Sequence, residues 1–465
     1  MMQVARKLGT KCAGLALLAF ATLNASAFAQ EASVEERLAA LEGQGSAYVD
    51  NSYLFLIGGL IVMFMAAGFL CLEAGLVRSK NAAMQSTKNV ALFSIAGLMF
   101  WLVGYNMAYP ASTILGGLFG IPDFIWTPGE PATSDGDYAS ASDWFFQMVF
   151  VATAASIVSG TVAERVKLWP FLLFTAVLTA FIYPIVASWE WGGGYLDSVW
   201  GFSDFAGSTL VHSTGGWAAL VGAIIIGPRA GKYFGKQVNP MPGSNIPLAA
   251  LGTFILWFGW FGFNGASQLA AGTISDINSV AIIFANTNMA AVGGVLAAMI
   301  LTSVLYKGKI DATMVFNGAI GGLVSITAEP LAPSMGAALL IGGVGGVLVV
   351  LTVPLLDKFK IDDVVGAIPA HLVCGIWGTV IVAASYGNTI MPPAPDADGA
   401  IGVSYVGQLV GVGLTGLFVC VAATIVWTLL KVTMGVRVSD DDQLLGLDKA
   451  EIGLEAYPEF ATTGR

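Results

Sequence analysis

The sequence predicts an all-α protein that crosses a membrane eleven times, and three observations support this prediction. Hydrophobic residues make up 56% of the 465-residue chain and charged residues only 11%, whereas about 25% of the residues of a soluble domain are charged. Eleven apolar segments follow one another, each near the ~20 residues that a tilted helix needs to cross a bilayer. Lysine and arginine fill every second connection between them, which gives the segments a direction.

The first segment of the chain is typical of a secretory signal. Arg6, Lys7 and Lys11 form a positive start, and an apolar stretch and a small-residue cleavage site follow. The apolar stretch is too short to span a bilayer comfortably, so we expect residues 1–29 to be removed rather than to form a further anchor. Residues 30–50 then form a polar periplasmic arm.

The membrane domain is expected to occupy residues 51–435, and a tail of residues 436–465 follows it. The predicted spans lie at about 54–77, 90–109, 144–162, 168–188, 206–226, 246–264, 280–305, 312–328, 335–356, 364–384 and 403–430. Eleven spans divide into five, five and one. Because five is odd, the second five enter the membrane from the opposite side to the first five, which is typical of two inverted repeats with the ligand path between them.

Basic residues mark one side of this domain. They are Arg78, Lys80, Lys88, Arg165, Lys167, Arg229, Lys232, Lys236, Lys307, Lys309, Lys358, Lys360, Lys431 and Arg437. By the positive-inside rule, the side that they occupy is cytoplasmic. We therefore expect a multi-pass protein of the inner (cytoplasmic) membrane, with a periplasmic N-terminus and a cytoplasmic C-terminus.

Two histidines occur in the chain, and both lie inside apolar segments. An ionisable side chain at membrane depth is costly and marks a functional site by default. His212 lies six residues into the fifth span and His371 seven residues into the tenth, ~9 Å and ~10 Å from the ends at 1.5 Å per residue. Because these two spans enter from opposite sides, we expect both imidazoles to line a transport path near the middle of the membrane.

Aromatic and polar residues are predicted to gather just outside the histidines. They lie on the third span, at the outer end of the fourth and near the outer end of the sixth. The set comprises Phe146, Phe150, Trp191, Trp260, Phe263 and Ser267. Aromatic faces attract cations, and a serine hydroxyl can accept a hydrogen bond from one. Their convergence at one depth predicts a cation site.

Several long stretches match the motifs of one membrane family in the correct order. Residues 204–229 resemble its signature, FQMVFVATAASIVSGTVAER its third span, WFGFNGAS its sixth and DDVVGAIPAHLVCGIWG its tenth. By these motifs the chain resembles the ammonium transporter (Amt/Mep/Rh) family, and within it the bacterial Amt type. The resemblance implies eleven spans and a homotrimer with one pore in each subunit.

The resemblance also implies roles for single residues at the outer site. Trp191 and Ser267, with Phe150, resemble the vestibule that recruits the ammonium cation. Phe150 and Phe263 resemble a stacked gate beneath it.

Further roles are implied around the pore. His212 and His371 resemble a hydrogen-bonded pair with complementary tautomers. Asp204 resembles an acidic residue near the vestibule, and we expect it to be structural, because a carboxylate can cap the free N–H groups where a helix starts. Gln147, beside Phe146, resembles a polar vestibule residue.

These features predict that ammonium is recruited and deprotonated at the vestibule and crosses an apolar pore lined by the histidine pair. Such a pore penalises an intact ion heavily, and ammonium can lose a proton whereas potassium cannot. We expect the histidines to relay the proton, so that uptake is electrogenic. A passive ammonia channel and an ammonium sensor with little transport are the alternatives.

Other function classes fit less well. No basic run indicates nucleic acid, so the expected partners are ammonium or ammonia, membrane lipid and further copies of the chain. Two histidines are too few ligands for a catalytic metal site, and a two-histidine haem would colour the purified protein. We expect neither an enzyme nor a bound cofactor.

The tail contains a further resemblance. The stretch GLDKAEIGLEAY is similar to a tail motif of the family that couples subunits and contacts PII-type signal proteins. Ile452 stands where many members have histidine. The resemblance implies a PII-type partner at the cytoplasmic face.

Overall fold

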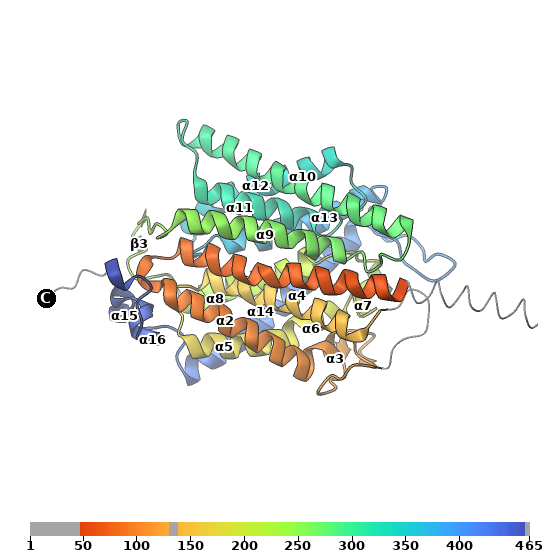
Figure 1. Ribbon diagram of the computed structural model, residues 1–465, viewed down its shortest axis with the longest axis horizontal. Helices are drawn as coiled ribbons and strands as arrows, with labels where there is room; N and C mark the ends of the chain where they lie inside the picture. Colours follow the sequence, from red (N-terminus) through yellow and green to blue (C-terminus); the bar gives the residue numbers. More distant parts are fainter. Residues whose placement is uncertain (1–46, 130–137, 461–465) are drawn as a thin grey trace, which may run out of the picture.

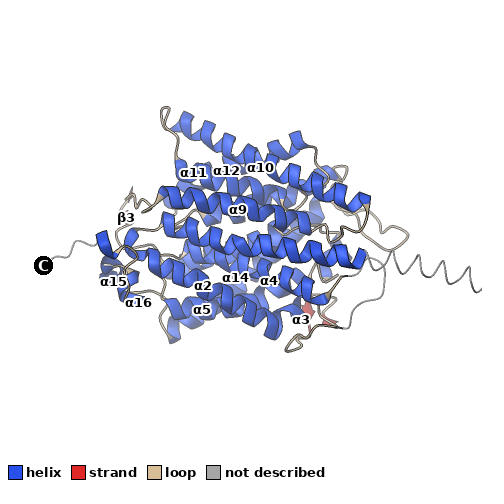
Figure 2. Ribbon diagram, in the orientation of Figure 1, coloured by secondary structure: helices blue, strands red, loops and turns tan. Residues whose placement is uncertain are grey.

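The computed structural model describes residues 47–129 and 138–460. The predicted signal segment 1–29 and most of the arm 30–50 lie outside the described residues. In the described part, long helices run side by side along one axis, and the connections gather at the two ends of this bundle (Figure 1, Figure 2). The predicted all-α membrane fold is thus confirmed.

Ten helical runs in the described part of the chain have the length and apolarity of a membrane span. They are Ala47–Leu76, Ser79–Ala108, Ser140–Thr161, Leu168–Ser188, Ser208–Ile226, Ile246–Ala266, Ile274–Leu305, Met335–Lys358, Ile368–Ser385 and Tyr405–Thr433. The predicted span at 312–328 is instead a shorter apolar helix, α11 (Ala312–Ile326). Its 15 residues extend only ~22 Å, less than a hydrocarbon core of ~30 Å, so the predicted count of eleven spans is not confirmed.

Several of these runs contain more than one element. The helices are α2 (Ala82–Met99), α3 (Tyr105–Ala108), α4 (Ser140–Thr161), α5 (Leu168–Val177), α6 (Tyr183–Ser188), α7 (Tyr195–Trp200), α8 (Thr214–Ile226), α9 (Ile246–Ala266), α10 (Ile274–Leu305), α11, α12 (Met335–Lys358), α13 (Cys374–Ser385), α14 (Tyr405–Thr433), α15 (Asp440–Leu445) and α16 (Leu447–Ile452). Wider π-helical turns are η2 (Phe100–Gly104), η3 (Leu178–Ile182), η4 (Ser208–Ser213) and η5 (Ile368–Val373). The 3-10 turn η1 (Ser79–Asn81) opens the second span, and the 3-10 turn η6 (Pro458–Phe460) lies in the tail. Two hairpins lie in the connections, β1 (Thr113–Ile114) with β2 (Phe119–Gly120) and β3 (Tyr233–Phe234) with β4 (Gln237–Val238).

Polar residues define where five long helices begin. The side chains of Asn245, Thr273, Asp311, Ser334 and Ser404 each accept a hydrogen bond from a free N–H group in the first turn of α9, α10, α11, α12 and α14, respectively. These N–H groups have no partner within the helix, so a side-chain oxygen that satisfies one of them stabilises the helix start.

Glycines allow α10, α11 and α12 to pack at very short distance. A Cβ atom at Gly342 would lie 1.9 Å from the backbone oxygen of Ala290, and one at Gly294 would lie 2.0 Å from that of Gly318. Side chains larger than hydrogen cannot occupy these positions without moving a helix. Small residues of this kind are the usual means by which membrane helices approach each other closely.

The centre of the bundle has the symmetry that an inverted repeat predicts. The π turn η4 of the fifth span packs against α13 of the tenth, and the π turn η5 of the tenth packs against α8 of the fifth. Each predicted pore histidine lies in one of these two turns.

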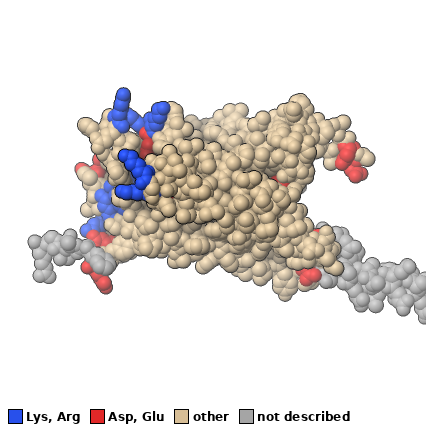
Figure 3. Space-filling model, turned by 90° about the horizontal axis from the view of Figure 1, so that it is seen from above, with Lys and Arg blue, Asp and Glu red and all other residues tan. Residues whose placement is uncertain are grey.

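Lysine and arginine side chains gather at one end of the bundle, on the face that Figure 3 displays. This end, which carries η1, α15 and α16, is called the basic end below. There the Arg229 guanidinium donates two hydrogen bonds to Asp362, both of 2.9 Å, and ties the loop after the fifth span to the loop before the tenth. Burial alone would raise the pKa of Asp362, but the hydrogen bonds from Arg229 and the charge of Arg165 hold it well below its ordinary range.

The prediction that Lys88 lies in a connection is wrong. The second span begins at Ser79 rather than near residue 90, so Lys88 lies on α2 with only 1% of its surface exposed. Its Nζ donates a 2.9 Å hydrogen bond to the backbone oxygen of Ser159 and lies 4.9 Å from the ring centroid of Phe171. A buried ammonium group needs such partners, and these come from α4 and α5, far away in the sequence.

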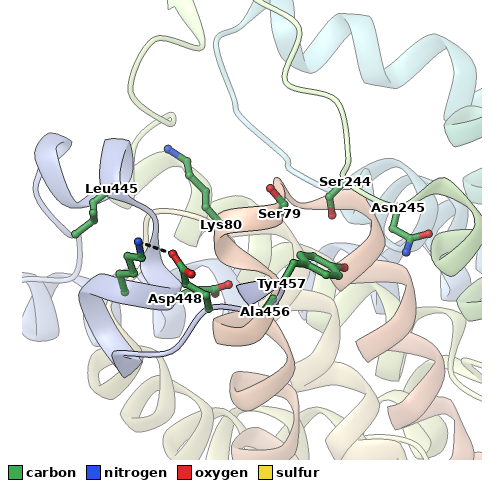
Figure 4. Close-up of a pocket in the computed structure, with 10 residues that line it drawn as sticks. Ser79, Lys80, Ser244, Asn245, Leu445, Asp448, Ala456 and Tyr457 are labelled. Carbon is green, nitrogen blue, oxygen red and sulfur yellow. Dashed lines mark ion pairs between the residues drawn. The ribbon is translucent and has the colours of Figure 1, made fainter. Parts of the chain in front are cut away.

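The tail folds back onto the basic end instead of extending into solvent. Asp448 accepts hydrogen bonds from the N–H groups of Ala83 (3.1 Å) and Met84 (2.7 Å) and so caps the start of α2. Lys80 donates to two backbone oxygens in α15. A pocket of about 430 Å³ lies between the tail and this part of the second span, and Asp448 is among its lining residues (Figure 4).

The capping role of Asp448 can be tested by substitution. We expect Asp448→Ala to weaken the docking of the tail by about 1 kcal/mol, because the loss of a helix cap costs about 0.5–2 kcal/mol. Limited proteolysis of the purified protein measures this change as faster cleavage within residues 436–460. Asp441→Ala, at an exposed position of α15, is the matched control, and equal cleavage rates in the two variants would contradict the capping role.

Candidate functional site

A cavity of about 140 Å³ lies near the end of the bundle opposite the basic end. Five residues predicted from the sequence line it: Phe146, Gln147, Phe150, Trp191 and Ser267. The structure adds Tyr109, Tyr138, Asp143, Phe205 and Leu269 to this lining. The third, fourth and sixth spans therefore bring their predicted residues together in one place, which we call the outer cavity.

Ser267 presents an acceptor to the outer cavity. Its hydroxyl proton is engaged, because Oγ donates a 2.8 Å hydrogen bond to the backbone oxygen of Phe263 one turn earlier. The lone pairs of Oγ are then available to an N–H donor in the cavity. Trp191 is held in place by a 3.1 Å hydrogen bond from its Nε1 to the backbone oxygen of Asp204.

Two phenylalanines close the inner side of the outer cavity. The rings of Phe150 and Phe263 stack with centroids 3.9 Å apart and planes 17° from parallel. Both side chains are almost completely buried. Phe146 contacts the same stack, with its ring edge-on to Phe150 at 4.6 Å. At this separation the two rings are in van der Waals contact.

The two histidines meet directly behind the stacked rings. Nδ1 of His212 and Nδ1 of His371 are 3.2 Å apart, and their ring centroids are 5.2 Å apart. The ring of Phe263 lies 5.2 Å from that of His212, and Trp260 stacks on the same imidazole at 5.0 Å. Trp260 is itself fixed by a 2.8 Å hydrogen bond from Nε1 to Thr327.

The short contact between the two Nδ1 atoms fixes the protonation pattern of a neutral pair. One Nδ1 must carry the proton and the other must accept it, so one Nε2 is an acceptor and the other is a donor. Nε2 of His212 is buried and has no hydrogen-bond partner among the described residues. The pair can therefore offer both a donor and an acceptor to a small molecule.

Glycines let the two histidine-bearing spans cross at contact distance. A Cβ atom at Gly375 would lie 2.3 Å from the backbone oxygen of Ser208, and one at Gly216 would lie 2.6 Å from Cβ of Leu372. Each histidine lies in a π-helical turn, a wider turn that is often found at functional sites. A wider turn changes the direction in which its side chains project from the helix. The glycines allow the two turns to pack against each other.

Asp204 holds the start of the fifth span. Its Oδ1 accepts hydrogen bonds from the N–H groups of Gly207 and Ser208, and its Oδ2 from those of Thr209 and Leu210, at 2.7–3.0 Å. Burial raises the pKa of Asp204 and the four N–H donors lower it, and together they leave the pKa at about 6. At neutral pH the carboxylate is mainly ionised, as four acceptor contacts require. It does not line the outer cavity.

Two further cavities lie between the histidine pair and the basic end. The first is small: the centre of a water molecule can move within only about 10 Å³ of it. His371, Glu73 and Asn317 are among the residues that line it. The second has a volume of about 390 Å³ and shares Asn317 and Val365 with the first. We call them the inner cavity and the basic-end cavity. Five features thus follow one another along the bundle: the outer cavity, the phenylalanine stack, the histidine pair, the inner cavity and the basic-end cavity.

Two carboxyl groups on this path were not among the residues singled out from the sequence. Asp143 lines the outer cavity and accepts a 2.6 Å hydrogen bond from the hydroxyl of Tyr105. Glu73 lines the inner cavity and is 1% exposed. The available signal was an acidic residue within an apolar span, the same signal that identified the histidines. Within residues 47–129 and 138–460, no cluster of three or more histidine, cysteine or acidic side chains could hold a metal ion.

Comparisons with known proteins agree with one another. The sequence model of the Ammonium Transporter Family matches residues 53–457. The chain is 39% identical to ammonium transporter Amt2 of Archaeoglobus fulgidus over 425 residues, 88% of either chain. It is 43% identical to a putative ammonium transporter of Synechocystis sp. over 336 residues, 72% of this chain and 75% of the relative. A solved structure titled Sensor Amt Protein superposes with a TM-score of 0.78 at 34% identity and covers 87% of this chain and 98% of its own.

The role of Asp204 generates a prediction with two variants. Asp204→Ala removes all four acceptor contacts, and each buried N–H left without a partner costs about 1–3 kcal/mol, so we expect a large loss of thermal stability and of transport. Asp204→Asn keeps an acceptor oxygen and should retain part of both. Thermal unfolding in detergent and uptake assays measure the two effects. Complete inactivity of both variants, with normally folded protein, would indicate that the charge of Asp204 engages the transported cation.

Proposed function

Because the chain belongs to the ammonium transporter family, we propose that it carries ammonium across a membrane along the series of cavities described above. One observation carries this proposal: two hydrogen-bonded histidines lie behind a closed phenylalanine stack, with cavities on either side. Such a pore is apolar at its centre yet offers a donor and an acceptor where water is scarce.

The outer cavity is the proposed recruitment site. The aromatic faces of Phe150 and Trp191 attract a cation through their ring quadrupoles, and Oγ of Ser267 accepts a hydrogen bond from it. The carboxyl group of Asp143 adds negative charge to the same cavity. Ammonium is thus held as an ion before it meets the stack.

The phenylalanine stack then acts as a gate that an ion does not pass intact. An aromatic pair contributes about 0.5–1.5 kcal/mol beyond its buried area, and this contribution and the burial of the rings together favour the closed stack. A charge that enters the apolar space behind them loses its hydration, and this penalty is far larger. Ammonium avoids the penalty when one of its N–H bonds breaks, the proton is taken up by an imidazole nitrogen of the histidine pair and the rest enters as ammonia, whereas potassium has no proton to give up.

The histidine pair binds the ammonia that has passed the phenylalanine stack. Ammonia both donates and accepts hydrogen bonds, which complements the donor and acceptor positions of the pair. We propose that the same pair relays the proton, because its Nδ1 atoms are 3.2 Å apart and the proton can move between them. Net movement of ammonia with a proton makes transport electrogenic.

The position in the cell and the assembly are part of the same proposal. The basic end faces the cytoplasm of an inner membrane, following the positive-inside rule, and the outer cavity faces the periplasm. Many large hydrophobic side chains on the outside of the bundle remain exposed, and they would be covered by lipid and by neighbouring subunits of a homotrimer. Removal of residues 1–29 as a signal fits this orientation.

An ammonium pulse on proteoliposomes tests the function. A current in response to the pulse supports electrogenic transport. Uptake of ammonia without a current supports the passive channel, and binding without flux supports a sensor. The sensor alternative has a specific basis, since the chain resembles the structure titled Sensor Amt Protein at 34% identity.

The histidines give a sharp prediction. We expect His212→Ala and His371→Ala each to lower the ammonium current about tenfold or more, because either change ends the proton relay and leaves the other buried imidazole without its hydrogen-bond partner, which costs about 1–3 kcal/mol. The protein should still fold, since an alanine fits within the helix. Transport of potassium by either variant would also agree with the pore assignment, because the space left by the missing imidazole admits water that can hydrate an ion. Wild-type rate and selectivity in both variants would exclude the pore assignment.

The tail gives a second prediction, which concerns a PII-type partner. We propose that such a protein docks at the basic end and inhibits transport. Removal of residues 439–465 keeps the hydrogen bond from Arg437 to the backbone oxygen of Pro228 and should abolish inhibition by the partner. Co-purification with a PII-type protein of the host measures binding directly. Equal binding by the full-length and shortened proteins would show that the docking surface lies elsewhere.

A further inference from the structure

Glu73 occupies a place on the path that the proposed function has not used. It lies on the helix Ala47–Leu76 and lines the inner cavity together with His371. The space in this cavity is about what one water molecule needs. A single small donor such as water or ammonia therefore fits between the histidine pair and the carboxyl group.

The two oxygens of Glu73 have different surroundings. Oε2 accepts hydrogen bonds from the side chains of Gln85, Asn89 (2.7 Å) and Ser159 (2.8 Å). Oε1 is buried, and no described residue donates to it. A buried carboxyl oxygen without a partner is costly unless a bound molecule satisfies it.

The surroundings show where the free oxygen lies. A Cβ atom at Gly160 would be 3.3 Å from Oε1 and 2.4 Å from Cγ2 of Val365, which also lines the inner cavity. Oε1 is thus close to the wall formed by Val365, whereas the three donors to Oε2 lie on α2 and α4. The helices hold one oxygen of Glu73 firmly and leave the other one for the cavity.

We propose that Glu73 is an inner proton acceptor, at which ammonia that has passed the histidine pair becomes ammonium again. The proposal rests on the function proposed above. An N–H bond of the protonated pair breaks, and an O–H bond forms at Oε1 through the molecule in the inner cavity. That O–H bond then breaks as ammonia takes the proton, which leaves ammonium and a carboxylate. Ammonium continues into the basic-end cavity, which both acidic and basic side chains line: Asp311, Asp357, Asp363, Arg229 and Lys232.

A purely structural role for Glu73 makes a different prediction. Ser159 links Glu73 to the buried Lys88, because its Oγ donates to Oε2 and its backbone oxygen accepts from Nζ. If Glu73 serves only to balance the charge of Lys88, removal of both groups should restore what removal of one destroys. If Oε1 accepts a proton, the double variant should remain defective.

The experiment compares four proteins with the wild type in proteoliposomes. Glu73→Gln keeps the size of the side chain but cannot take up a proton, and we expect its ammonium current to fall about tenfold or more. Glu73→Asp should keep a measurable part of the current. Glu73→Gln with Lys88→Met should recover thermal stability without recovering current. Glu329→Gln is the matched control, since Glu329 is a buried carboxyl group that does not line any of the three cavities.

Infrared difference spectra provide a readout that does not depend on transport. An ammonium pulse should produce the C=O band of a protonated carboxyl group in the wild type and in Glu329→Gln, and Glu73→Gln should lack it. This band without any flux would support the inner acceptor while it contradicts the proposed transport. Wild-type current in Glu73→Gln, recovery of current in the double variant, or an unchanged band in Glu73→Gln would each overturn the inner acceptor.

Discussion

The contact between Nδ1 of His212 and Nδ1 of His371 is the interaction on which the rest of the path depends. It requires two spans from different halves of the chain to cross at contact distance, and Gly216 and Gly375 make this crossing sterically feasible. Asp204 then fixes the start of one of these spans through four N–H groups. Polar groups at membrane depth are costly, and the hydrogen bonds of Asp204 and the contact between the two imidazoles offset part of this cost.

The path separates tasks that conflict at a single site. A site that holds a cation needs charge and polarisable rings, whereas a site that rejects ions needs a dry apolar wall. The outer cavity has the first property and the stack of Phe150 on Phe263 has the second. In the proposed mechanism, the histidines provide limited polarity behind the stack, where a neutral molecule can bind and an ion would lose its hydration.

Much of this arrangement could be predicted from the sequence, because hydrophobic length, basic residues and span parity together fix depth and direction. That information predicted that the histidines and the aromatic residues lie near one another; in the structure Trp260 stacks on His212 and does not line the outer cavity. It misplaced Lys88, since a lysine normally marks a loop and its partner Ser159 lies on another helix. Asp143 and Glu73 were missed for a related reason: they are identified by the cavities that they line, and these cavities form only when several spans pack together. The short helix α11 shows that apolarity alone does not set helix length.

The docking of the tail has a consequence for the inner cavity, because the tail and Glu73 both contact the same turn of α2. Asp448 binds the N–H of Met84, and the next residue along α2, Gln85, donates to Glu73. The first turn of α2 therefore contacts both the tail, through Met84, and Glu73 beside the inner cavity, through Gln85. Coupling free energies are reciprocal, so if tail docking strengthens binding in the inner cavity by some factor, an occupant of that cavity strengthens tail docking by the same factor.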